Sequence, residues 1–231
     1  MFIPVLGWQK TAGQSREIIS LSKKLEKALN TKGEKDFKTL FHPDSSKKLA
    51  RSHKNFKTFF DSPKWSVRSN NNKSEDKSFL DVEVKAKRKV GNHKYNLKAK
   101  QVLEIKIKEG KILDYKLINQ ESILKTENSP LRVKLEIPDE VLTGTIYDLE
   151  IILEDPLDNY IITGGLIETN DADLKQNASP KIDLKPIQSG GIFKSAKAPL
   201  KEGSQTWAAL IAHPHGLIAI TKMVRISDSK N

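Results

Sequence analysis

The hydrophobic period of the chain changes once, near Pro63, and this change limits the fold more than any other feature of the sequence. Before Pro63 apolar residues recur every three or four positions, a spacing that is typical of amphipathic helices. It predicts helices at residues 16–30, 34–41 and 45–60. After Pro63 apolar and polar residues alternate, as they do in strands with one buried face. The alternation predicts strands at residues 64–69, 78–90, 93–108 and 111–120.

The order of these elements predicts the fold class of the first half. Gly91 and Asn92 are a two-residue turn signal, so the strands on either side of them are expected to pair antiparallel. A run of helices followed by a run of strands indicates an α+β domain in which the helices cover one face of an antiparallel sheet. We expect this domain at residues 14–125.

The second half contains only strand signals. Thr126–Pro130 has the polar, turn-forming composition of a linker, and we expect a separate domain at residues 130–227. Short alternating runs separated by turns predict an all-β sandwich of the immunoglobulin-like type, although the Cys–Trp–Cys core of antibody domains is absent. The runs lie at residues 131–137, 145–153, 159–169, 181–187, 191–196, 205–213 and 216–226.

Arg16–Lys32, the aromatic second and third helices, and the paired strands Asp81–Val90 and His93–Lys108, closed by Lys111–Gln120, carry a resemblance to a known family. In this order they resemble the nuclear transport factor 2-like (SnoaL-like, cystatin-like) superfamily, over a little under half of the chain. The resemblance implies a curved sheet wrapped by helices around a conical pocket. Together with the sandwich that follows, the chain resembles uncharacterised two-domain bacterial proteins.

Charge is distributed unevenly along the chain, whose net charge is +11. Residues 1–125 hold 29 Lys and Arg against 14 Asp and Glu, whereas residues 126–231 hold 11 against 15. An excess of this kind favours an anionic partner, namely an acidic protein, a small anionic ligand or a membrane surface contacted peripherally. Lys outnumbers Arg 34 to 6, which is also what AT-rich codon usage produces. Nucleic acid is a less favoured partner, because its recognition relies on Arg forks and stacking aromatics.

Part of this charge falls on one face of the predicted sheet. Alternation places seven lysines opposite the apolar face of the two central strands, where they form a candidate partner-binding surface. They are Lys85, Lys87, Lys89, Lys98, Lys100, Lys106 and Lys108. A solvated face without a partner is the alternative.

The absence of cysteine from the chain excludes several kinds of chemistry. With no cysteine, the chain has no disulfide, no thiolate nucleophile and no Cys-ligated metal. It has no apolar run of the roughly 18–20 residues that span a bilayer. Residues 1–13 form an apolar arm, which either packs on the domain or is the remnant of a signal peptide that begins upstream. As written the chain is expected to be cytoplasmic, and to be exported to the periplasm if its start codon is truncated.

The pocket that the resemblance implies would be lined by the apolar face of the sheet. Polar residues on that face or beside it are therefore candidate ligand-binding residues. They are Arg88, Gln101, Tyr95, Tyr115, Trp65 and His53. Enzymes of the superfamily use a pocket Asp or His as a general base, and the cavity-facing positions of the two central strands carry no Asp or Glu. His53 alone remains, so we assign no catalytic residue.

Two further motifs are expected to be structural. His213-Pro214-His215-Gly216 places two histidines two residues apart, but a metal site needs three or four ligands, and a hairpin turn explains the motif better. Trp207 alternates with Ala209 and Ile211 and is expected in the core. We therefore predict no metal and no cofactor.

The sequence thus predicts a non-enzymatic accessory protein that binds an acidic protein or a small anionic ligand through its basic half. The alternative is a small-molecule enzyme of the isomerase or lyase kind, with its site in the first domain. The oligomeric state stays open.

Overall fold

The computed structural model describes residues 12–31, 34–70, 77–154, 160–169, 181–187 and 190–228. The chain forms two compact units. Unit 1 consists of Met1–Ala86 and Lys100–Ile118, and unit 2 consists of Lys87–Ala99 and Asn119–Asn231. Three long strands therefore contribute residues to both units, and each unit is described by itself.

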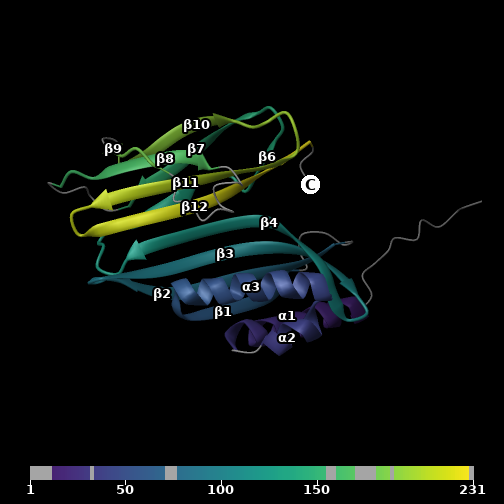
Figure 1. Ribbon diagram of the computed structural model, residues 1–231. Helices are drawn as coiled ribbons and strands as arrows, with labels where there is room; N and C mark the ends of the chain where they lie inside the picture. The colour runs from purple at the N-terminus through teal and green to yellow at the C-terminus, as the bar shows by residue number, and fades with distance from the viewer. Residues whose placement is uncertain are drawn as a thin grey trace, which may run out of the picture. The chain divides into compact units, whose positions relative to one another are not determined.

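Unit 1 begins with the three expected helices, α1 (Ala12–Asn30), α2 (Glu34–Leu40) and α3 (Pro43–Phe59). The helical period of the sequence predicted all three within four residues at each end. Pro43 begins α3 without cost, because the amide at a first helical position has no partner inside the helix. Helices α1 and α3 pack against β1 (Asp61–Asn70) (Figure 1).

Four strands follow the helices as hydrogen-bonded neighbours in chain order: β1, β2 (Ser78–Val90), β3 (His93–Lys108) and β4 (Lys111–Thr126). Gly91 and Gly110 take positive φ at the turns between them, as the turn signals predicted. In unit 1 Leu80, Val82, Ile105 and Ile112 of this sheet are buried with the apolar stripe of the helices in one core cluster.

Unit 2 contains two sheets. In one, β4 is followed by β12 (Gly216–Ser227), β11 (Gly203–His213), β8 (Thr163–Thr169) and β9 (Lys185–Pro186), while β6 (Glu140–Leu142) pairs parallel with β12. The other has the order β10 (Gly191–Lys197), β7 (Ile146–Leu153) and β5 (Val133–Glu136). Leu149 and Ile151 of the second sheet are buried in one core with Ile211 and Ile218 of the first. The β11–β12 hairpin is yellow in Figure 1.

Trp207 is buried in this core, which confirms its expected place. Its indole N–H donates to the hydroxyl oxygen of Tyr147 at 2.9 Å, and that hydroxyl donates to Oε1 of Gln205 at 2.9 Å. The amide of Gln205 in turn donates to Glu168 at 3.1 Å. The three buried side chains therefore satisfy one another, as buried polar groups must.

The predicted fold class is wrong. The described structure is mostly β, with 60% of residues in strands and 20% in three helices, and it contains a large antiparallel sheet instead of a helix-covered α+β domain followed by an immunoglobulin-like sandwich. The reason is the length and pairing of the strands. β3 and β4 have 16 residues each, and β4 continues to Thr126, where it pairs with β12.

Two of the five residues of the expected linker are buried, whereas Glu127, Asn128 and Pro130 are exposed. Thr126 ends β4 and is buried, as is Ser129, and Oγ1 of Thr126 accepts a hydrogen bond from the amide of Leu217 at 3.0 Å. Residues 1–11 of the apolar arm, and residues 170–180, lie outside the described residues. Among the helices that the structure describes, none is long and apolar enough to cross a membrane.

Candidate functional site

Unit 1 contains a cavity of about 230 Å³ that is partly open to solvent. Ten of its fifteen described lining residues are Leu, Ile, Val or Phe, contributed by the helices, the sheet and the segment between α2 and α3. The other five carry a polar group and are Ser52, His53, Trp65, Gln101 and Tyr115. None of these fifteen residues is Asp, Glu, Lys or Arg. The cavity is therefore an apolar site with a few neutral polar groups, the usual composition of a small-molecule pocket.

The local periods of the sequence bring these residues together. On α3, Leu49, His53 and Phe56 recur at helical spacing and so lie on one stripe. On β3, Gln101, Leu103 and Ile105 alternate and so share one face of the strand.

His53 has a fixed orientation in the wall. Its Nε2 lies 2.7 Å from the carbonyl oxygen of Leu29, near the end of α1. A carbonyl oxygen only accepts hydrogen bonds, so Nε2 carries the hydrogen and Nδ1 of the neutral ring is left as an acceptor. The ring of Phe37 meets the imidazole edge to face, with centroids 5.1 Å apart. Helix, carbonyl and ring thus hold the imidazole in place.

The same environment keeps His53 uncharged at neutral pH. Burial lowers its pKa from the usual 6.5, the positive charge of Lys57 lowers it further, and the bond to the Leu29 carbonyl opposes both. Because the folded pKa lies below the unfolded one, the native state binds fewer protons than the unfolded chain at acidic pH.

This shift predicts a pH dependence of stability. The contribution of His53 is present above pH 6.5 and is lost as the pH falls through its lowered pKa. We expect the free energy of unfolding to fall between pH 7.5 and pH 5.5, and to fall less in His53→Gln, which cannot titrate there. Urea unfolding at the two pH values measures both. An equal fall in the two proteins contradicts the assignment.

Trp65 forms the adjacent wall. Asn30 anchors its backbone, since Oδ1 of Asn30 accepts from the Trp65 amide and Nδ2 donates to the Trp65 carbonyl, both at 2.9 Å. The indole lies 5.1 Å from the ring of Phe56 and 6.1 Å from that of His53, between centroids. Its Nε1–H is buried and has no hydrogen-bond partner among the described residues. An unmatched buried donor is costly, so an acceptor that reached this N–H would stabilise it.

Tyr115 closes another side of the cavity from β4. Its ring packs edge to face on Phe41, with centroids 6.3 Å apart. Burial raises the pKa of its hydroxyl, and the negative charge of Asp114 raises it further. The hydroxyl therefore stays protonated at neutral pH, so the two titratable groups of the cavity are both neutral.

Four of the six candidate residues line the cavity, namely His53, Trp65, Gln101 and Tyr115. The other two, Arg88 and Tyr95, are partly exposed and belong to unit 2. Phe56 and Trp65 are part of the wall, and Phe60 stacks on Phe56. Ser52 was missed, although it directly precedes His53 on α3.

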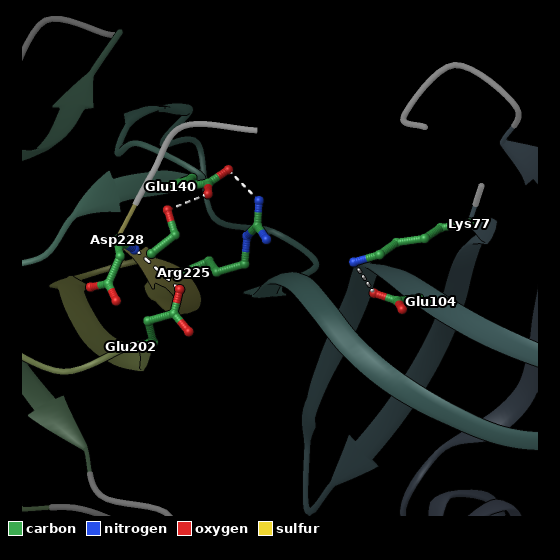
Figure 2. Close-up of polar contacts among 7 residues, drawn as sticks. Lys77, Glu104, Glu140, Glu202, Arg225 and Asp228 are labelled. Atoms are coloured by element: carbon green, nitrogen blue, oxygen red, sulfur yellow. Dashed lines mark hydrogen bonds and ion pairs between the residues drawn. The ribbon is translucent and has the colours of Figure 1, made fainter. Parts of the chain in front are cut away.

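All seven lysines of the predicted basic face are exposed. Lys85, Lys100, Lys106 and Lys108 belong to unit 1, and the other three belong to unit 2. Acidic neighbours offset part of the charge: Lys85 lies 3.8 Å from Glu83, and Lys87 lies 3.3 Å from Glu127. In unit 1 Lys77 pairs with Glu104 at 3.6 Å, as Figure 2 shows. The face is basic but already partly paired.

The two histidines of the β11–β12 turn make structural contacts. Nδ1 of His213 accepts a hydrogen bond from the amide of His215 at 3.1 Å, and Tyr160 packs edge to face on both rings. A metal-bound histidine normally donates from its second nitrogen, which His213 cannot do while Nδ1 accepts. No group of three or more His, Cys, Asp or Glu residues in the described part of the chain could hold a metal ion.

Comparison with known proteins concerns the other unit. Residues 128–227 match a family described as a domain of unknown function (DUF8623). This span lies within unit 2, whereas every residue that lines the cavity belongs to unit 1. No curated protein matches the chain.

Proposed function

We propose that this chain is a non-enzymatic binding protein whose unit 1 cavity holds a small, uncharged and mainly apolar molecule. The observation that carries the proposal is the cavity of about 230 Å³ whose described lining residues carry no charge, His53 and Tyr115 being both neutral. An apolar cavity of about 150 Å³ in another protein stays free of water and binds benzene. The space in unit 1 is large enough for a molecule with one substituted ring.

The described residues of the wall include no Lys or Arg, and this favours an uncharged ligand over an anionic one. An anion taken out of water needs a partner charge, because an unpaired buried charge is unstable. Since no Lys or Arg lines the cavity among the described residues, the small anionic ligand expected from the net charge is not supported there. Binding of an acidic protein through the exposed lysines of unit 1 stays a prediction, favoured by their exposure.

The enzyme alternative has less support. Isomerase and lyase chemistry needs a base of suitable pKa facing the substrate. No carboxylate of the described part of the chain lines the cavity, and the lowered pKa of His53 makes its free nitrogen a weaker base than an ordinary histidine. We therefore assign His53 to binding.

Filling the cavity tests the proposal. Leu49 lies in the wall on α3, and Leu49→Trp places a larger side chain there. We expect the full-length protein to bind toluene in calorimetric titration, and Leu49→Trp to weaken that binding at least about tenfold by occupying the space.

The matched control is Lys48→Trp, which introduces the same side chain one residue earlier at an exposed position. It should bind toluene as the unsubstituted protein does. Toluene binding that is absent from the unsubstituted protein, or unaffected by Leu49→Trp, rules the cavity out as the site.

A further inference from the structure

We infer that the molecule held in the unit 1 cavity carries a hydroxyl group, which donates its hydrogen to Nδ1 of His53. This inference rests on the proposed function, because it names the class of ligand for the same cavity. The class is a small apolar alcohol or phenol.

The hydrogen-bonding polarity of His53 is fixed by the protein. Its Nε2–H is committed to the carbonyl of Leu29 at 2.7 Å, so the ring cannot exchange donor and acceptor without leaving that carbonyl unmatched. Nδ1 is therefore an acceptor, and no hydrogen bond of Nδ1 occurs among the described residues. A ligand gains from this atom only if it brings a hydrogen-bond donor.

The other polar groups of the wall do not impose such a requirement. The hydroxyls of Ser52 and Tyr115 rotate and both donate and accept. They accommodate ligands of either polarity. His53 is thus the lining residue that discriminates between a ligand with a donor and one without.

Trp65 contributes the complementary requirement. Its ring centroid is 6.1 Å from that of His53, and its buried Nε1–H is a donor with no partner among the described residues. A hydroxyl oxygen is the smallest group that serves both: it donates its hydrogen to Nδ1 of His53 and accepts from Nε1 of Trp65. The second bond requires the indole to turn, because its nitrogen is covered in the structure.

Three probes with the same ring separate the contributions. Phenol brings a donor and an acceptor, anisole brings an acceptor only, and toluene brings neither. In calorimetric titrations of the full-length protein at pH 7 we expect phenol to bind about tenfold more tightly than anisole, the difference that one hydrogen bond to a matched buried acceptor makes.

The outcomes distinguish the two proposals. If phenol, anisole and toluene bind equally, the hydroxyl preference is overturned while the apolar cavity remains a binding site. If none of them binds, the proposed function fails and the inference fails with it. Tighter binding of phenol than of both others supports both.

Two variants then locate the preference. His53→Gln keeps an N–H for the Leu29 carbonyl and an oxygen that accepts, so it should retain the preference for phenol. His53→Leu removes both, so the ratio of its phenol affinity to its anisole affinity should fall to about one. The ¹⁵N chemical shift of His53 Nδ1 in the unsubstituted protein provides a measurement that needs no variant. It should move when phenol is added and stay when toluene is added, and a shift that is the same with both overturns the assignment.

Discussion

Gly216→Ala lowers the free energy of unfolding of unit 2 by about 3 kcal/mol, because the substitution combines backbone strain with a steric clash. Gly216 begins β12 at φ +145°, a conformation that side chains with a Cβ rarely adopt. A Cβ built there lies 2.7 Å from the Cβ of Thr126, which is closer than real contacts allow. Thr126 cannot move away freely, since its Oγ1 accepts from the amide of Leu217.

Gly203→Ala is the control, because Gly203 begins β11 of the same hairpin and a Cβ there meets nothing within 4 Å. Its stability should stay close to that of the unsubstituted protein. Urea denaturation followed by circular dichroism measures both variants, and amide hydrogen exchange of β12 shows whether unit 2 carries the loss. Equal stability of the two variants contradicts the strain assigned to Gly216.

The sequence predicted the elements far better than their pairing. Alternation and helical spacing are local signals, and they placed β2 at residues 78–90 and β3 at residues 93–108 as the structure has them. Alternation tells which residues share a face but does not tell which strand lies alongside. The pairing of Ile220 with Ile123, almost a hundred residues apart, therefore left no local trace, and the fold class was mistaken.

The sequence did not predict strand β6. β6 has three residues, Glu140–Leu142, and pairs parallel with the end of β12. Three residues are too few to show a period of two. Two side-chain hydrogen bonds tie β6 to β12. Oε2 of Glu140 accepts from Arg225 (Figure 2), and Oε1 of Glu140 accepts from Ser227.

In the candidate site, too, local signals predicted some features, and features that depend on distant residues were not predicted. Gln101 was identified because it interrupts the apolar face of the sheet, and His53, Trp65 and Tyr115 because they were expected beside that face. Arg88 follows the same alternation on β2 but belongs to unit 2, and the period of a strand does not change where one compact unit ends. The tautomer of His53 could not be predicted at all, since it depends on the carbonyl of Leu29, 24 residues away on another helix.

Phe37→Ala should destabilise unit 1 by about 4 kcal/mol, the usual cost of removing a buried aromatic ring and leaving a cavity. Phe37 is 2% exposed and lies within the core that joins the helices to the sheet. The neighbouring Lys38 is exposed on the same short helix, so Lys38→Ala is the control and should change little. Urea denaturation of the two variants measures the difference, and similar midpoints contradict this account of the core.

Phe37→Ala also tests the inferred preference of the cavity for a ligand with a hydroxyl group. Phe37 meets the imidazole of His53 edge to face at 5.1 Å and restricts its rotation. With that ring removed, the bond to the Leu29 carbonyl and the contact with Trp65 still hold the imidazole, but one side of the ring is no longer packed. A loosely held acceptor discriminates less, because ordering it costs free energy on binding. In conditions where Phe37→Ala remains folded, phenol should therefore lose more affinity than toluene. An equal loss for both probes shows that Phe37 supports the cavity as a whole and does not orient His53.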